Sequence, residues 1–204
     1  MKKYLFIAIA FLAVLSCGQE NTSVSTAVSF DDVLATRRSI RDFDSSKEVT
    51  EAQVREILTA AQDAPSWANI QPSRYYVAIN PDKADAVRDL IGERNKQSTS
   101  GAPVFIVSTY ARGLSGFFRG NQTNEIGDGW GAYDNGLSNS YLVMKARALG
   151  LDTLIMGMRD SDGLRVLFGI PENETVMAVI ALGHRASDPV KPTRKSLDEI
   201  AKFF

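Results

Sequence analysis

The chain has 204 residues, and its 23 Lys and Arg nearly balance its 24 Asp and Glu, giving a formal net charge of −1 at pH 7. Such a balance excludes the basic surface by which proteins bind nucleic acids, so we expect no nucleic-acid partner. With one Cys and one His, the sequence also excludes an internal disulfide, a His-based metal cluster and a Ser-His-Asp triad.

The N-terminal sequence MKKYLFIAIAFLAVLSCGQE is typical of a bacterial export signal. Two lysines precede twelve uncharged residues, a run shorter than the about 20 residues that a membrane span needs. The run ends in VLSC, which resembles the lipobox of bacterial lipoproteins, where the Cys becomes the lipidated N-terminus. We therefore expect a lipoprotein signal peptide at residues 1–16 and a lipid anchor at Cys17. An ordinary secretory signal with a chance Cys is the alternative.

The small, polar residues that follow are expected to form, with the lipidated Cys, a flexible tether at residues 17–29. The rest of the chain, residues 30–204, is long enough for one domain with a hydrophobic core. Together these features predict an exported, membrane-anchored lipoprotein on the periplasmic side of a membrane or at the cell surface.

Capping residues and hydrophobic periodicity predict the helices of this domain. Ser29 is the expected N-cap of the first helix, and TEAQ from Thr50 has the form of a capping box that starts the second. Gly150 is the expected C-cap of a long helix that starts at Tyr133. Helices are expected from residue 30 to near 37, from 51 to before 65, from 81 to about 91, from 133 to about 149 and from 162 to 169.

Runs of β-branched and aromatic residues predict strands at residues 74–80, 103–110, 151–157 and 175–183. The Gly- and Asn-rich residues 111–132 predict a long loop or lid. Long helices and separated strands indicate an α+β or α/β domain, with a central sheet packed by helices.

The sequence RRSIRDF at residues 37–43 places three arginines within five positions. In an extended chain Arg37, Ser39 and Arg41 would point to one side and Arg38 to the other. Two guanidinium groups and a hydroxyl on one side suit a phosphate, which Arg binds with bidentate, charge-assisted hydrogen bonds. The alternative is a solvated charge run beside two aspartates.

Three further features have both a functional and a structural interpretation. In the loop APSWANIQPS, Asn69 and Gln71 offer paired donors and acceptors that suit the edge of a flat heterocycle, or Asn69 serves only a tight turn. Gly157 lets backbone N–H groups approach a ligand closely, or it only ends a strand. Arg194 binds a ligand, or it is a solvent-exposed Arg in a polar tail.

The order of five blocks is more specific than any single one. RRSIRDF, APSWANIQPSRYYV, ALGLDTLIMGMRD, LFGIPENETVMAVIALGH and PTRKSLDEI resemble, in this order, the nitroreductase family of FMN-dependent oxidoreductases. The resemblance covers about residues 30–204. It implies an α+β homodimer whose two FMN sites lie at the subunit interface, with each subunit contributing to both.

The resemblance also implies which residues contact FMN. The phosphate, ribityl chain and ring edge would be contacted by Arg37, Arg38, Ser39 and Arg41. Pro65, Ser66 and Asn69 would lie near the isoalloxazine, and Ile155, Met156 and Gly157 would lie over the ring. Arg194 would also contact the phosphate. No catalytic side chain is implied, because the flavin performs the redox chemistry. The chain departs from the family at Ser73, where a Trp is common, and at Ser140-Tyr141, where Gln-Asn is common.

The expected activity is transfer of a hydride or electrons from NAD(P)H or another reduced donor, through flavin N5, to a nitro, quinone or similar small-molecule acceptor. Export conflicts with NAD(P)H, which is a cytoplasmic metabolite, so either the donor differs or the N-terminus is not an export signal. Alternatives are a flavin-binding lipoprotein without turnover, a relative that performs dehalogenation or flavin breakdown, and a surface adhesin without flavin.

Overall fold

The computed structural model describes residues 28–204. The predicted signal peptide, Cys17 and nearly all of the predicted tether lie outside the described residues. No helix within residues 28–204 is long and apolar enough to cross a membrane.

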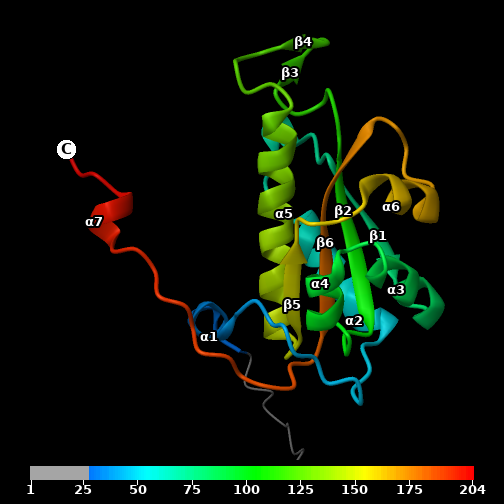
Figure 1. Ribbon diagram of the computed structural model, residues 1–204. Coiled ribbons are helices and arrows are strands. Elements are labelled where there is room, and N and C mark those ends of the chain that lie inside the picture. The colour runs from blue at the N-terminus through cyan, green and yellow to red at the C-terminus, as the bar shows by residue number, and fades with distance from the viewer. Residues whose placement is uncertain (1–27) are drawn as a thin grey trace, which may run out of the picture.

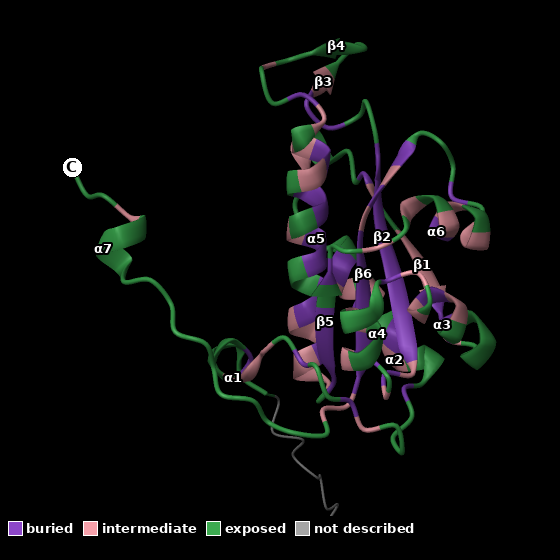
Figure 2. Ribbon diagram, viewed as in Figure 1, coloured by how far each residue is buried: buried purple, intermediate pink, exposed green. Residues whose placement is uncertain are grey.

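A four-stranded sheet forms the centre of the domain, in the order β1-β2-β6-β5, and each neighbouring pair is antiparallel (Figure 1). The central strands β2 and β6 are long apolar runs, buried on both faces of the sheet (Figure 2). The strands are β1 (Ser73–Ala78), β2 (Val104–Ala111), β5 (Asp152–Met156) and β6 (Glu174–Gly183). Since helices flank this antiparallel sheet, the prediction of an α+β fold is confirmed.

Alternate residues of β2 face opposite sides of the sheet, as the period of a strand requires. Phe105 and Val107 join the core cluster that holds α3 (Pro81–Arg88) and α6 (Ser161–Phe168). Val104 and Ile106 join the cluster on the other face, which is covered by α2 (Glu51–Gln62) and α5 (Gly129–Ala148). The sheet is therefore packed between two layers of helices.

Three helix ends follow the predicted capping chemistry. The Ser29 hydroxyl accepts a hydrogen bond from the Asp32 N–H at the start of α1 (Phe30–Thr36). Thr50 and Gln53 form the reciprocal bonds of a capping box at the start of α2. Gly150 has a φ of +78°, and its N–H donates to a carbonyl of the last turn of α5.

The structure differs from the predicted elements in the predicted lid. The short hairpin of β3 (Phe117–Phe118) and β4 (Asn121–Gln122) lies within it, at one end of the molecule (Figure 1). Helix α5 begins at Gly129, four residues before the predicted start. The glycines in this first turn have low helix propensity, so the sequence did not predict a helix there. One of these glycines is required, because a Cβ on Gly131 would lie 2.5 Å from the Tyr110 ring. Helix α4 (Glu93–Ser98) was not predicted.

The residues from 186 onward are here called the C-terminal arm. Its first two residues, Ala186 and Ser187, donate hydrogen bonds to Asp42, and the chain then leaves the domain. Nearly all residues of the arm are exposed, and Figure 1 shows α7 (Leu197–Ile200) standing apart from the sheet and its helices. Five large apolar side chains of the arm are uncovered: Val190, Leu197, Ile200, Phe203 and Phe204.

Candidate functional site

Residues 37–41, here called the arginine segment, run beside the edge strand β5. Ser39 pairs with Thr153 in a parallel bridge, and the Ile40 N–H donates to the Thr153 carbonyl at 3.0 Å. Ile40 is fully buried, whereas Ser39 and Arg41 are exposed. The segment is therefore extended, with Ile40 directed into the core and its neighbours directed outward.

The three arginines have different surroundings. Arg38 Nη1 donates to the carbonyls of Ala35 (3.2 Å) and Thr36 (2.6 Å), which lie in the last turn of α1 and lack partners within the helix. The guanidinium groups of Arg37 and Arg41 form no hydrogen bond or ion pair with any other residue between 28 and 204, although the backbone N–H of Arg37 donates to the Val33 carbonyl. Two unpaired guanidinium groups beside an exposed hydroxyl fit a phosphate, and the side chain of Arg38 is used within the fold.

At the end of β5, the groups available to a ligand belong mainly to the backbone. Met156 is 3% exposed and belongs to the core, so only its backbone is available to a ligand. Ile155 and Gly157 are exposed. They follow Thr153 closely, so this strand end and the arginine segment form one half of a site, here called the phosphate half.

The loop at residues 64–71 has an unusual backbone. Ala68, Asn69 and Gln71 have positive φ values of 45°, 57° and 52°, which are unfavourable for residues with a side chain. The Ser66 hydroxyl accepts a hydrogen bond from the Gln71 N–H at 2.9 Å and closes the loop. Non-Gly residues held in this region are typical of functional sites, where the surrounding structure imposes the conformation.

Asp134 of α5 fixes this loop and was not predicted as a site residue. Its carboxylate accepts a hydrogen bond from the Trp67 N–H at 3.0 Å, and the residue is 3% exposed. No local pattern in the sequence distinguishes it from a surface Asp, because its partner lies 67 residues away.

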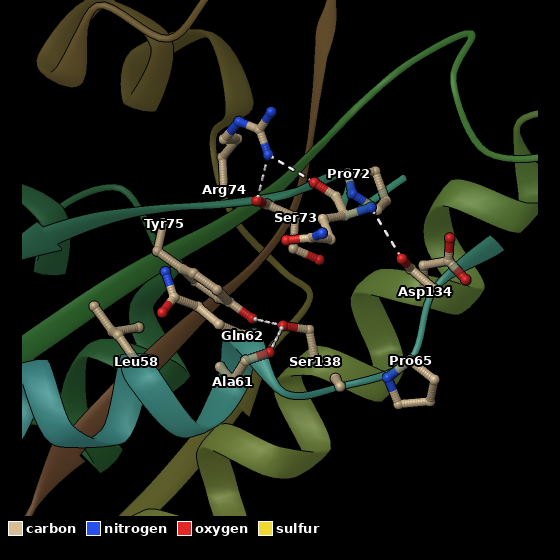
Figure 3. A pocket seen from close by; sticks show the side chains of 13 residues that line it. Leu58, Ala61, Gln62, Pro65, Pro72, Ser73, Arg74, Tyr75, Asp134 and Ser138 are labelled. Carbon is tan, nitrogen blue, oxygen red and sulfur yellow. Dashed lines mark hydrogen bonds between the residues drawn. The ribbon is translucent and has the colours of Figure 1, made fainter. Parts of the chain in front are cut away.

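A pocket of ≈ 360 Å³ lies between the loop, the end of α2, the start of β1 and α5 (Figure 3). Pro65, Ser66 and Asp134 are among its lining residues. At its floor Ser138 Oγ donates to the Ala61 carbonyl at 2.8 Å and lies 2.7 Å from the Tyr75 hydroxyl. Burial raises the pKa of Tyr75, and the hydrogen bond to Ser138 opposes the rise.

An aromatic cluster of Trp67, Trp130 and Tyr133 lies beside the loop. The ring centroids of Trp67 and Trp130 are 4.8 Å apart, and those of Trp130 and Tyr133 are 5.6 Å apart. Trp130 Nε1 donates to Asn124 Oδ1 at 3.0 Å. This cluster therefore connects residues 112–128, which we call the lid, to the loop. The loop and the aromatic cluster together form the loop half of the site.

One chain does not bring the two halves together. In the phosphate half, Ser39 pairs with Thr153 on the edge strand β5. Thr153 is paired with Leu182 of β6, and Leu182 is paired with Val104 at the start of β2. The loop half precedes Ser73 on the other edge strand, which pairs with Tyr110. Six residues along a strand span about 20 Å, and three interstrand gaps add about 14 Å across the sheet. The predicted FMN contacts of one chain are thus in two separate places.

Arg194 lies in neither half. On the C-terminal arm, its Nη1 is near only the adjacent carbonyls of Pro192 and Thr193, at 3.5 and 3.4 Å. The prediction that it contacts a phosphate requires a position that the arm of a single chain does not provide.

Comparison with known proteins identifies the family of the chain. Residues 34–184 match the model of the Nitroreductase family. The NADH dehydrogenase of Thermus thermophilus is 28% identical over 190 residues, covering 80% of this chain and 90% of that protein. Iodotyrosine deiodinase 1 of Mus musculus is 27% identical over 201 residues, covering 84% of this chain and 68% of that protein.

A solved structure from Exiguobacterium sibiricum, in complex with FMN, has the same fold. Its TM-score is 0.76 at 20% identity, covering 88% of this chain and 99% of that chain. The family match includes every strand of the central sheet, the arginine segment and the loop at 64–71. The chain therefore belongs to the nitroreductase family of FMN-dependent oxidoreductases.

Proposed function

We propose that the protein is a homodimeric oxidoreductase that binds FMN and passes electrons from a reduced donor to a nitro, quinone or similar small-molecule acceptor. When bound, FMN supplies the redox chemistry, because its ring accepts a hydride and passes the electrons on. The observation that carries the proposal is the pair of unpaired guanidinium groups, Arg37 and Arg41, beside β5 and its exposed end.

In this proposal Arg37 and Arg41 bind the FMN phosphate, and the Ser39 hydroxyl donates to one of its oxygens. Charge-assisted bonds of this kind are about twice as strong as neutral ones. The backbone of Ile155 to Gly157 lies against the ring, where it keeps that face free of water. Arg38 acts on α1 instead, through the two carbonyls that it binds.

A second copy of the chain completes the site. Since the phosphate half and the loop half lie at the two opposite edge strands of the sheet, a flavin held by the first would meet the loop of another subunit. The C-terminal arm supports this assembly, because its uncovered apolar side chains need a surface to cover them. On a partner subunit, Arg194 has a route to a phosphate that it lacks in its own chain.

The aromatic cluster supports a planar acceptor. Tyr133 is 60% exposed and stands edge-on to Trp130, so its ring is available for stacking. Nitroaromatic compounds and quinones are flat π systems that would stack there. The similarity to an NADH dehydrogenase supports a reduced nicotinamide as donor.

Reductive dehalogenation is the second candidate, favoured by the similarity to iodotyrosine deiodinase 1 over 84% of the chain. In that reaction a carbon–iodine bond is replaced by a carbon–hydrogen bond, two electrons and a proton are consumed, and iodide leaves. Release of iodide from iodotyrosine by the reduced protein would establish it. Reduction of nitro compounds without iodide release would exclude it.

We also propose that the protein is exported and anchored by a lipid on Cys17. The proposal is supported by the sequence alone, since residues 1–27 lie outside the described part of the chain. Lipid labelling and fractionation of the wild type and of Cys17→Ala test it. Unlabelled wild-type protein in the cytoplasmic fraction would contradict it, and membrane-bound protein would favour a quinol or a partner protein as donor.

The decisive experiment is titration of protein lacking residues 1–17 with FMN. We expect binding that quenches the flavin fluorescence, followed by reduction with NADH, NADPH or a quinol and reoxidation by nitro compounds or quinones. A protein that stays colourless in excess FMN would refute the proposed function. A protein that binds FMN but turns over with no donor would be a flavin-binding lipoprotein without turnover.

A further inference from the structure

Asp152, the first residue of β5, is a carboxylate in the interior of the protein. It is 2% exposed and lies between two arginines. Arg185 binds it with a bidentate fork, Nε to Oδ2 at 2.8 Å and Nη2 to Oδ1 at 2.6 Å. Arg147 Nη1 donates to both of its oxygens, at 3.2 and 3.1 Å. A buried carboxylate is tolerated only when it is paired and hydrogen-bonded to this extent.

Arg185 continues this network to both ends of the arginine segment. Its Nη2 also donates to the carbonyl of Thr36, the residue just before Arg37, at 3.1 Å. Its backbone forms an antiparallel bridge with Phe43, two residues beyond Arg41. The guanidinium group is thus attached to one end of the segment and the backbone to the other.

Asp152 also lies next to the middle of the segment. The residue that follows it, Thr153, pairs with Ser39 and accepts the hydrogen bond from Ile40. One buried carboxylate therefore orients the side chain that holds the first end of the segment, and its own strand holds the centre. Arg185 also pairs with the exposed Asp188, so the four charges of the cluster sum to zero. The cluster therefore acts on the segment through its geometry, since it adds no net charge.

We infer that Asp152 is a positioning residue for phosphate recognition: it fixes Arg185, and Arg185 fixes the segment that presents Arg37 and Arg41. The inference rests on the proposed binding of FMN at this segment. Asp152 contacts no part of the cofactor, because both of its oxygens face arginines inside the protein. Asp152 therefore affects the binding of the phosphate and leaves the binding of the flavin ring unchanged.

Riboflavin separates this role from general support of the fold, since it has the ring of FMN and lacks the phosphate. In Asp152→Asn the bidentate ion pair is lost and the size of the side chain is kept. We expect the Kd for FMN to rise about tenfold, equivalent to one charge-assisted hydrogen bond, while the Kd for riboflavin changes less than about twofold. The ratio of the two Kd values is the measured quantity.

Two other variants keep the test decisive. Arg185→Lys retains the positive charge, loses the fork and the bond to Thr36, and should reduce the preference for FMN in the same way. Asp89→Asn removes an exposed carboxylate that pairs with Lys96 on the surface, and should leave both Kd values unchanged. If Asp152→Asn does not fold, the Kd ratio of Arg185→Lys decides.

The possible outcomes are distinct. Equal weakening of FMN and riboflavin, or no weakening of either, would overturn the positioning role while leaving FMN binding intact. Wild-type protein that binds neither flavin would overturn the proposed function, and the inference with it. A selective loss of FMN binding in both Asp152→Asn and Arg185→Lys would establish the role.

Discussion

Arg37, Arg38 and Arg41 are close in sequence, yet the side chain of Arg38 alone is used by the fold. Alternation along an extended chain predicts this division, because it places Arg38 on the side opposite to the other two. The structure agrees: the guanidinium group of Arg38 binds two carbonyls of α1, and those of the other two arginines have no partner within residues 28–204. That the unpaired guanidinium groups of Arg37 and Arg41 contact FMN remains a prediction.

We therefore expect Arg37→Ala or Arg41→Ala to weaken FMN binding by about 1.5–3 kcal/mol, which is roughly 10- to 150-fold in Kd. Arg38→Ala should lower the melting temperature, because α1 loses the donors at its end, with a smaller effect on the Kd. Fluorescence titration and thermal unfolding measure the two effects. Arg55→Ala is the control, since Arg55 is exposed on α2 and pairs with Glu51 one turn away. Equal FMN losses at positions 37, 38 and 41 would contradict the division.

The hydroxyl of Tyr75 makes stability depend on alkaline pH. Its pKa is raised by burial, so the folded protein holds this proton more tightly than the unfolded chain. The stabilisation is complete below the ordinary tyrosine pKa of about 10 and is lost as pH rises through the folded-state value. Tyr75→Phe should cost about 1 kcal/mol at neutral pH, from the bonds to Ser138 and Asn139, and should flatten the decline above pH 10. Urea unfolding between pH 8 and 11 measures this, and parallel curves for the two proteins would refute it.

Asp134 and Asp152 show what a sequence does not reveal at this scale. A carboxylate becomes a buried structural group only through donors that the fold brings to it, and Asp152 pairs with an Arg 33 residues away. In the sequence both residues resemble ordinary surface aspartates. The backbone strain at Ala68, Asn69 and Gln71 was equally hidden, because none of these is a Gly.

At the scale of elements, local chemistry predicted most boundaries. The capping residues Ser29, Thr50 and Gly150 form their hydrogen bonds with residues a few positions away. The local sequence is therefore sufficient to predict these helix ends. The start of α5 was predicted too late because its first turn contains glycines, one of which accommodates Tyr110. The hairpin in the lid lacks the alternating hydrophobic pattern that predicts strands, so the sequence did not reveal it. Its position depends on tertiary contacts such as those of Trp130.

The lid should be held in place by Trp130. Trp130→Ala removes the ring contact with Trp67 and the bond to Asn124, so the lid should open more often. We expect trypsin cleavage after Arg119, which is exposed between β3 and β4, to accelerate on the order of tenfold. Trp130→Phe keeps an aromatic contact and should show a smaller increase. Unchanged cleavage in both variants would mean that the lid is held by other contacts.

At the scale of the molecule, the α+β fold, the oxidoreductase class and the FMN cofactor were predicted correctly, because five ordered blocks specify the family. The separation of the two halves was not visible, since sequence order says nothing about distance across a sheet. The homodimer and the residue contacts with FMN remain predictions. So does the N-terminal anchor, which lies outside the described residues.

The C-terminal arm should be required for assembly and dispensable for folding. Both core clusters are complete before the arm begins, so protein lacking residues 190–204 should fold as a monomer with greatly weakened FMN binding. Sedimentation equilibrium and circular dichroism measure assembly and folding separately. Ile200→Asp should act in the same direction, and Val166→Asp, at an exposed apolar position on α6, is the matched control. A dimer that persists without the arm would contradict this role.

The distance between the two halves has a genetic consequence. A subunit with Arg37→Ala and Arg41→Ala is damaged only in its phosphate half, and one altered at Ser66 and Asn69 only in its loop half. Neither should bind FMN alone, but a mixed dimer combines both defects in one site and leaves the other intact. When equal amounts of the two altered subunits reassociate at random, about one quarter of all FMN sites should be intact. Two inactive alleles of this protein should therefore complement each other in one cell.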